Sequence, residues 1–183
     1  MAYLSPAEFV TKMVDTGEAK IHMSTRDTLI RAFMAGAILA LAAVFAVSAS
    51  VMSGSALIGA LLFPVGVCML YLLGFDLLTG VFMLTPLALL DKRPGVTVRG
   101  ILRNWGLVFV GNFLGALTVA GMMAFIFTYG FSVPPGEIGQ KIGHIGEART
   151  LGYAEYGLMG WATIFLRGVL CNWMVSTGVV GAM

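Results

Sequence analysis

The chain has 183 residues, of which 58% are hydrophobic and 11% are charged, and its formal net charge at pH 7 is +2. This composition lies well outside that of soluble globular domains and predicts an integral membrane protein. The sequence shows no nucleophile–base pair, metal-ligand cluster or phosphate-binding loop, so we expect neither an enzyme nor a cofactor or metal, and no nucleic-acid partner.

The first predicted element is an amphipathic helix in the polar N-terminal segment, residues 1–28. Ser5, Pro6 and Glu8 form a capping-box pattern with proline at the first helical position. We expect Gly17 to end this helix. The helix either lies on the cytoplasmic membrane surface or packs on other cytoplasmic parts of the protein, and the sequence leaves both arrangements open.

Four segments are apolar enough to span a bilayer, which takes about 20 helical residues. They are residues 29–51, 56–90, 105–129 and 158–183, and together they form one predicted transmembrane domain, residues 29–183. Lysine and arginine gather before the first span and after the second. The positive-inside rule therefore predicts a multi-pass protein of the cell inner (plasma) membrane with its N-terminus in the cytoplasm.

The second predicted span is too long for one straight crossing and contains the interruption Gly74-Phe75-Asp76-Leu77-Leu78-Thr79-Gly80. Non-helical backbone and a carboxylate at that depth are tolerated only where protein or a water-filled cavity satisfies them. The interruption therefore indicates a permeation pathway. We expect Gly74, Asp76 and Gly80 to have structural roles at the break, with Asp76 accepting hydrogen bonds from the backbone N–H groups that the break frees.

The first and last spans contain a similar motif, Leu29-Ile30-Arg31-Ala32-Phe33-Met34 in the first and Phe165-Leu166-Arg167-Gly168-Val169-Leu170 in the last. The two spans are predicted to enter the membrane from opposite sides, a pattern typical of an inverted-topology repeat. The last span reaches Met183 without polar anchors, so we expect the chain to be incomplete at its C-terminus. A natural four-span protein is the alternative.

Three stretches resemble the formate/nitrite transporter family. Residues 59–66 with 74–80 are similar to its second span, Asn104-Trp105 with residues 110–116 to its third, and residues 165–175 to its fourth. The resemblance implies an all-α, aquaporin-like helical bundle of six spans, four of them present here. It also implies a homopentamer with one pore per protomer that passes small monovalent anions such as formate, nitrite or hydrosulfide.

The resemblance also implies which residues line the pore. Phe63 and Val67 map to the family's apolar constriction, and Leu77 and Leu78 to loop residues that narrow the pore. Apolar constrictions force an anion to shed water, so a neutral protonated acid would cross more easily. For both leucines, packing against lipid or the protein core is the alternative.

Polar pore residues follow from the same resemblance. Thr79 maps to a threonine that faces the family's pore histidine, and the alternative is that it caps the half-helix starting near Gly80. Asn172 maps to a pore-chamber asparagine, and the alternative is hydrogen bonding between helices. Asp76 is not expected to bind substrate, because a carboxylate repels an anion. Arg149 is a candidate for the lysine that the family has before its fourth span.

The favoured function is therefore a channel or transporter for small monovalent anions, with proton coupling left open. A neutral-solute or water channel of the same shape is one alternative, although the sequence contains no Asn-Pro-Ala motif. A non-transporting, truncated membrane protein is the other.

Overall fold

The computed structural model describes residues 4–181, which form seven α-helices and one 3-10 helix. The elements are α1 (Pro6–His22), α2 (Thr25–Ser53), α3 (Ala56–Leu72), α4 (Leu78–Leu90), α5 (Val98–Phe127), α6 (Glu137–Ala148), η1 (Leu151–Tyr156) and α7 (Gly157–Gly181). Residues 1–3, 182 and 183 lie outside the described residues, so the outer ends of the predicted segments 1–28 and 158–183 are not compared.

The predicted fold class is confirmed, because the described chain is all-helical and apolar. Three helical stretches are long and apolar enough to cross a membrane, namely Thr25–Ser53, Val98–Phe127 and the stretch Glu137–Gly181 that contains α6, η1 and α7. Helices α3 and α4 are apolar but shorter. The predicted second span is therefore two half-length helices, and the chain is an all-α integral membrane protein.

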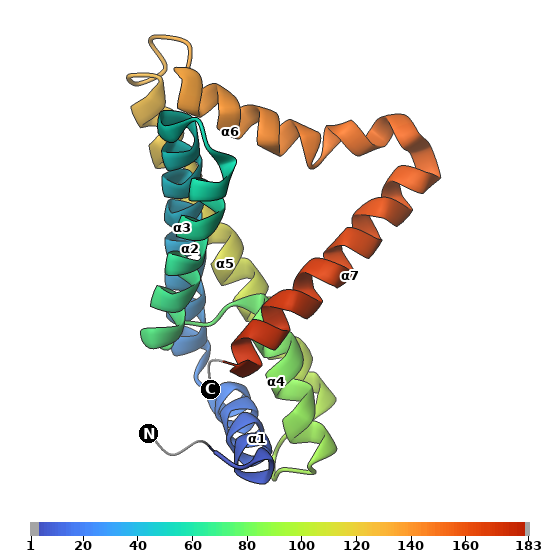
Figure 1. Ribbon diagram of the computed structural model, residues 1–183. Helices are drawn as coiled ribbons and strands as arrows, with labels where there is room; N and C mark the ends of the chain where they lie inside the picture. The colour runs from blue at the N-terminus through green and yellow to red at the C-terminus, as the bar shows by residue number, and fades with distance from the viewer. Residues whose placement is uncertain (1–3, 182–183) are drawn as a thin grey trace.

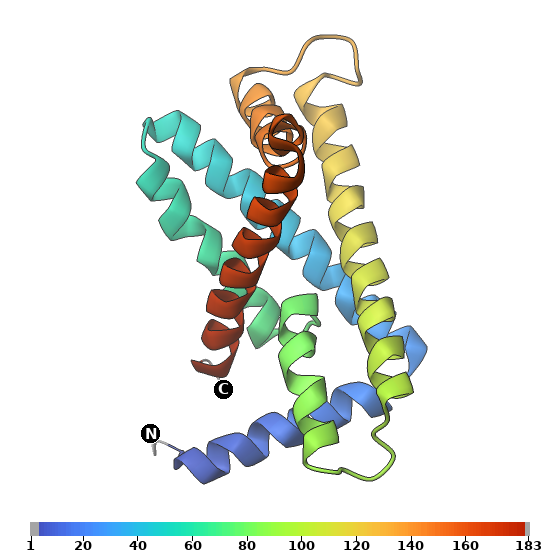
Figure 2. The ribbon, with the colours of Figure 1, turned by 90° about the vertical axis from the view of Figure 1, so that its right-hand side faces the viewer.

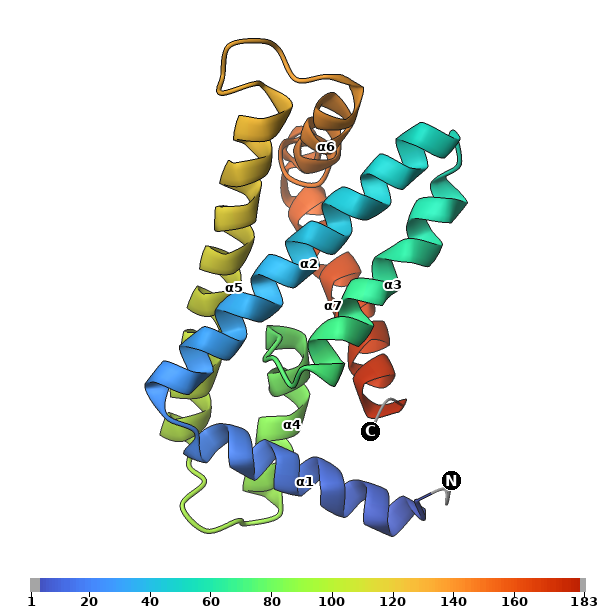
Figure 3. The same ribbon diagram turned by 90° about the vertical axis from the view of Figure 1, so that its left-hand side faces the viewer.

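The helices form a bundle with two outlying arms. Helices α2 and α3 run side by side, and α5 crosses α2 (Figure 3). Helix α1 lies across one end of the bundle, next to α4 (Figure 2). Helix α6 extends away from the other end, and α7 runs back diagonally toward α4, so that α3, α6 and α7 outline a triangle (Figure 1).

Small residues set the packing of α2 against α5. A Cβ atom added at Gly36 would overlap the backbone of Asn112, and one added at Gly115 would overlap the backbone of Phe33. Gly111 is similarly close to Ala32, which is completely buried. Because lipid removes the hydrophobic driving force between membrane helices, their association depends on van der Waals packing. The small residues allow the close approach of α2 and α5 that this packing needs.

The predicted capping box of α1 is confirmed. The Ser5 hydroxyl accepts a hydrogen bond from the backbone N–H of Glu8 at 3.4 Å, and the Glu8 carboxylate accepts one from the backbone N–H of Ser5 at 2.8 Å. The hydrogen bonds from the Ser5 hydroxyl and backbone lower the pKa of Glu8 below its ordinary value. This fixes where α1 begins.

The predicted end of α1 at Gly17 is wrong, since the helix continues to His22. Gly17 instead lies against the backbone carbonyl of Leu84 in α4, where a side chain would not fit. Met13, Val14 and Ile21 of the same helix are buried. Helix α1 therefore packs against other parts of the protein, which is one of the two arrangements that the sequence left open.

The loop after α4 holds α1 at a second place. Arg93 contacts Asp15 at 2.7 Å, Asp91 at 2.8 Å and Glu18 at 3.5 Å. The hydrogen bond with Asp91, followed by the charges of the acidic neighbours, raises the pKa of Arg93 above its ordinary value. These partly exposed pairs contribute little net stability each, but they fix the orientation of α1 relative to the loop.

Candidate functional site

The break between α3 and α4 begins with a glycine-dependent helix end. Helix α3 ends at Leu72, and the backbone N–H of Phe75 then donates to the carbonyl of Leu70 at 2.9 Å. Gly74 has a φ of +71°, in the left-handed region that glycine adopts without strain. This is a Schellman-type end, which satisfies carbonyl groups of the last turn of α3.

The side chain of Asn112 in α5 holds the non-helical backbone of the break. Its amide nitrogen donates to the carbonyls of Asp76 and Ala32, each at 2.8 Å, and its amide oxygen accepts from the N–H of Leu78 at 2.9 Å. Helix α4 consequently begins at Leu78, close to the predicted start near Gly80. One amide thus joins the break to α2 and α5.

The sequence suggested that Asp76 accepts hydrogen bonds from the freed N–H groups, but the structure shows a different partner. Its side chain is almost fully buried, and its Oδ1 atom forms an ion pair with Lys20 of α1. Its Oδ2 atom has no hydrogen-bond partner within residues 4–181. Asn112 already satisfies the backbone here. A buried carboxylate is far more stable when it is paired with a cation than when it is unpaired.

Two neighbouring contacts hold Lys20 and the break in place. The buried amide of Asn104 donates to the backbone carbonyl of Lys20 at 3.1 Å, which ties α1 to α5. Arg31 of α2 lies 3.5 Å from the carbonyl of Gly74 through its Nη1 atom. The break is therefore contacted by residues from α1, α2 and α5.

Helix α4 is attached to α5 by an indole. The Trp105 Nε1–H lies 3.2 Å from the carbonyl of Val81 and 3.0 Å from the hydroxyl of Thr85. Phe82 packs edge-on against the same ring. The sequence suggested only an interfacial position for Trp105 and no role for Asn112, although both belong to the third-span stretch that resembles the transporter family.

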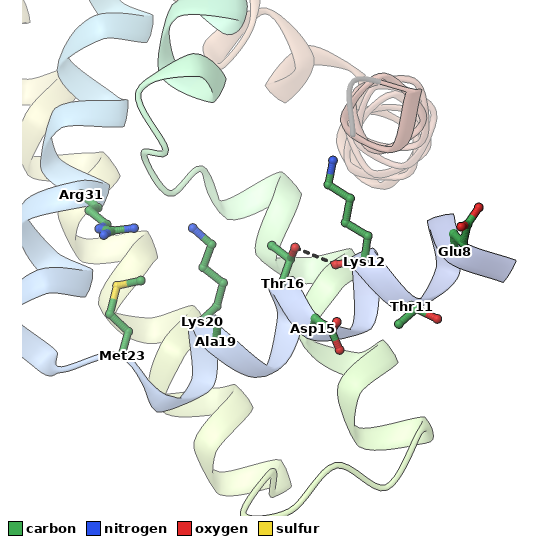
Figure 4. A pocket seen from close by; sticks show the side chains of 9 residues that line it. All are labelled: Glu8, Thr11, Lys12, Asp15, Thr16, Ala19, Lys20, Met23 and Arg31. Carbon is green, nitrogen blue, oxygen red and sulfur yellow. Dashed lines mark hydrogen bonds between the residues drawn. The ribbon is translucent and has the colours of Figure 1, made fainter. Parts of the chain in front are cut away.

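A cavity of about 510 Å³ lies between α1, the end of α3, the break and α4. Lys20, Cys68, Tyr71, Asp76 and Leu77 are among its lining residues. A second hollow follows α1, where Figure 4 shows Lys12 and Lys20 extending to the same side of the helix and Arg31 pointing toward them from α2. The predicted loop residue Leu77 therefore borders a cavity that contains basic side chains.

Phe63 and Val67, the residues predicted to form the apolar constriction, do not line the cavity at the break. Phe63 lines a different cavity of about 320 Å³, together with residues of α2 and α6 and with Arg149. Val67 is half-buried on α3. Phe63 and Leu77 thus border separate cavities, and Arg149 lies in the one that contains Phe63.

The other loop residues differ in their surroundings. Leu78 packs on a buried cluster formed by Ala32, Val81 and Val108, which corresponds to the core-packing alternative. The hydroxyl of Thr79 is buried and makes no hydrogen bond with any described residue. Because the helix cap position is Leu77, and no side-chain cap bond is formed, Thr79 does not cap α4.

Asn172 is not brought to the break by a hydrogen bond. Its amide nitrogen donates to the carbonyl of Gly168 in the same helix at 2.7 Å, and the residue is exposed. The contact of α7 with the break runs instead through Ser176, whose hydroxyl lies 3.5 Å from the carbonyl of Thr79.

The fold defines a multi-pass helical membrane protein. Its second span is interrupted by non-helical backbone that side chains of α1, α2 and α5 contact. A sequence model described as formate/nitrite transporter matches residues 7–183. The chain belongs to the formate/nitrite transporter family.

Individual relatives agree with this assignment. The chain is 30% identical to "Uncharacterized transporter YrhG" of Bacillus subtilis, covering 98% of this chain and 65% of the relative. It is 30% identical to "Probable formate transporter" of Methanothermobacter thermautotrophicus, covering 97% and 69%, and 30% identical to "Formate channel FocA" of Haemophilus influenzae, covering 96% and 60%. The chain thus spans roughly two thirds of the length of these relatives.

Proposed function

We propose that this protein passes small monovalent anions, such as formate or nitrite, along a route beside the broken second span. Family membership and the relatives named as formate transporters and channels support this function. The observation in this chain that carries the proposal is the Thr79 hydroxyl, which is buried at the break with no hydrogen-bond partner among the described residues.

The chemistry of Thr79 suits a passing anion. A hydroxyl is a hydrogen-bond donor, and a donor to a carboxylate or nitrite oxygen forms a stronger bond than one between neutral groups. Thr79 lies in the first turn of α4, where the helix dipole presents its positive end. Half-helix ends of this kind face anionic substrate groups in other transporters.

Apolar residues complete the proposed route. Phe63, Val67, Leu77 and Leu78 are the residues that we propose narrow it, and Asn172 is proposed to line its chamber. A narrow apolar passage strips water from an anion, which is costly, and a protonated acid crosses at lower cost. We therefore propose that a proton accompanies the anion through the constriction.

Assembly and orientation are part of the same proposal. We propose a homopentamer in the plasma membrane with α1 and the loop after α4 in the cytoplasm. The basic side chains of these two regions support that orientation. Mass measurement of the solubilised oligomer tests the pentamer, and protease protection of an N-terminal tag in vesicles of known orientation tests the topology.

Transport by the full-length protein in liposomes tests the function. We expect formate or nitrite flux far above glycerol flux. Equal glycerol flux would support the neutral-solute alternative and contradict the proposal, and an absence of any flux would support the non-transporting one.

A pair of variants tests the role of Thr79. Thr79→Val keeps the shape of the side chain but removes the donor, and we expect roughly a tenfold loss of anion flux, the value of one hydrogen bond. Thr79→Ser keeps the hydroxyl and should retain most of the flux. If Thr79→Val transports as fast as the unmodified protein, Thr79 does not contact the anion.

A further inference from the structure

The ion pair between Lys20 and Asp76 joins two distant parts of the chain at the break. The residues are 56 positions apart, and the carboxylate is nearly inaccessible to solvent. Asp76 borders the cavity of about 510 Å³ next to Leu77. The residues described as lining this cavity include two lysines, Lys12 and Lys20, and one acidic residue, Asp76.

The charge of Asp76 presents a problem for an anion pathway. A carboxylate beside the route repels an anion, and the repulsion is strong in a site partly shielded from water. With Lys20 in contact, the pair is neutral overall, and Lys12 adds positive charge to the same lining.

We propose that Lys20 is the counter-ion that makes the break accessible to anions, so that its charge determines whether the cavity accepts anions or only neutral acids. This inference rests on the proposed function. It assigns to a helix outside the spans a residue that controls the charge selectivity of the route.

Helix α1 is also held by contacts other than this pair. Asn104 binds the backbone of Lys20, Gly17 packs on the backbone of Leu84, and Arg93 contacts Asp15 and Glu18. A buried ion pair is in addition often no more stabilising than apolar residues of similar volume. These contacts point to an electrostatic role for Lys20 beyond attachment of the helix.

Four variants of the full-length protein in liposomes test the proposal. Lys20→Met leaves the carboxylate without its counter-ion, and we expect formate and nitrite flux at neutral pH to fall at least tenfold. Asp76→Asn alone should not lower anion flux. The double variant Lys20→Met/Asp76→Asn has a neutral break and should recover to within about threefold of the unmodified protein. Lys12→Met removes an equal charge from the same helix, and Asp76→Asn should not reverse its effect.

The pH dependence separates charge from structure. In Lys20→Met the remaining flux is carried by neutral acid, so it should approach that of the unmodified protein at low pH and fall more steeply as pH rises. The other ionisable groups that line the two cavities beside the pair are Tyr71 and Cys68 of α3, Glu8, Lys12 and Asp15 of α1, and Arg31 of α2. A purely structural defect would lower flux equally at all pH values.

A thiol assay gives a readout that needs no transport. Cys68 lines the same cavity, and Cys171→Ser leaves it as the single cysteine of the sequence. We expect Lys20→Met to slow modification of Cys68 by an anionic thiosulfonate and to accelerate modification by a cationic one. Asp76→Asn should remove that difference.

The outcomes distinguish the two proposals. If the unmodified protein passes no anions, the proposed function fails. If it passes anions, but Lys20→Met transports equally well, or the double variant stays as low as Lys20→Met, the function stands and the role of Lys20 is overturned. An unchanged charge preference at Cys68 would also overturn it.

Discussion

Helices α2 and α7 share a short sequence motif around an arginine but have very different surroundings. In the most apolar part of α2, 22% of the residues are buried, against 6% for the corresponding part of the stretch that contains α7. Arg31 near the start of α2 reaches the carbonyl of Gly74 at the break. Arg167, its counterpart in α7, binds the hydroxyl of Tyr153 and lies over the same ring.

The difference shows that a small-residue pattern produces close packing only where a partner helix supplies a matching surface. Gly36 of α2 touches the backbone of α5, and Gly66 of α3 touches Ala42 of α2. Apart from the neighbouring backbone of α7 itself, no described atom lies within 4 Å of a Cβ placed at Gly168 or Gly178. The predicted inverted repeat therefore remains a prediction about sequence, and its two first spans are not packed equivalently in this structure.

The largest effect is expected from filling the α2–α5 contact. Gly115→Leu would place a side chain onto the carbonyl of Phe33, and we expect it to lower the free energy of unfolding by about 3 kcal/mol or more. Gly168→Leu in α7 is the matched control and should have little effect. Thermal unfolding of the solubilised protein measures both, and equal shifts would contradict the comparison.

A smaller effect is expected from the two span asparagines. Asn112→Leu leaves the backbone of the break without its partners, so we expect a loss of about 2 kcal/mol and faster hydrogen exchange at residues 74–78. Asn172→Leu removes only a bond within its own helix and should be nearly neutral. Unchanged exchange at the break in Asn112→Leu would show that other groups hold it.

The smallest effect on stability is expected from replacing Arg31 or Arg167, the arginines at corresponding positions of the motif shared by α2 and α7. Arg31→Met removes one long contact with Gly74 and should cost less than about 1 kcal/mol. Arg167→Met should have a similarly small cost, through loss of the contact with Tyr153. Hydrogen exchange should increase at residues 74–77 in the first variant and at 151–157 in the second. The same exchange pattern in both would mean that the arginines have equivalent positions.

Several features of the site follow from local sequence. Ser5 and Glu8 lie three positions apart and cap the same turn, so their pairing needs no tertiary information. Gly74 follows the end of α3 in a conformation that glycine favours, and the long apolar stretch around it predicts an interrupted span. Both are decided by neighbours within a few residues.

Other features depend on contacts that no local pattern shows. Asp76 was expected to bind backbone groups, but Asn112 occupies them from 36 positions away. The end of α1 was placed at Gly17 because glycine often follows a helix, whereas here it provides room for the backbone of α4. Each residue type allowed two roles, and its neighbour in space selected one.

The sequence by itself determined the class of protein, the apolar spans and the interruption around Asp76, because hydropathy and helix-ending residues act over short stretches of chain. Only the tertiary structure decided what satisfies that interruption. Lys20 and Asn112 come from helices that are distant in sequence, and the close approach of α1 and α5 brings their side chains to the break. A buried charge and a freed N–H can each be satisfied by any partner of suitable chemistry, so the tertiary geometry decides which partner each one has.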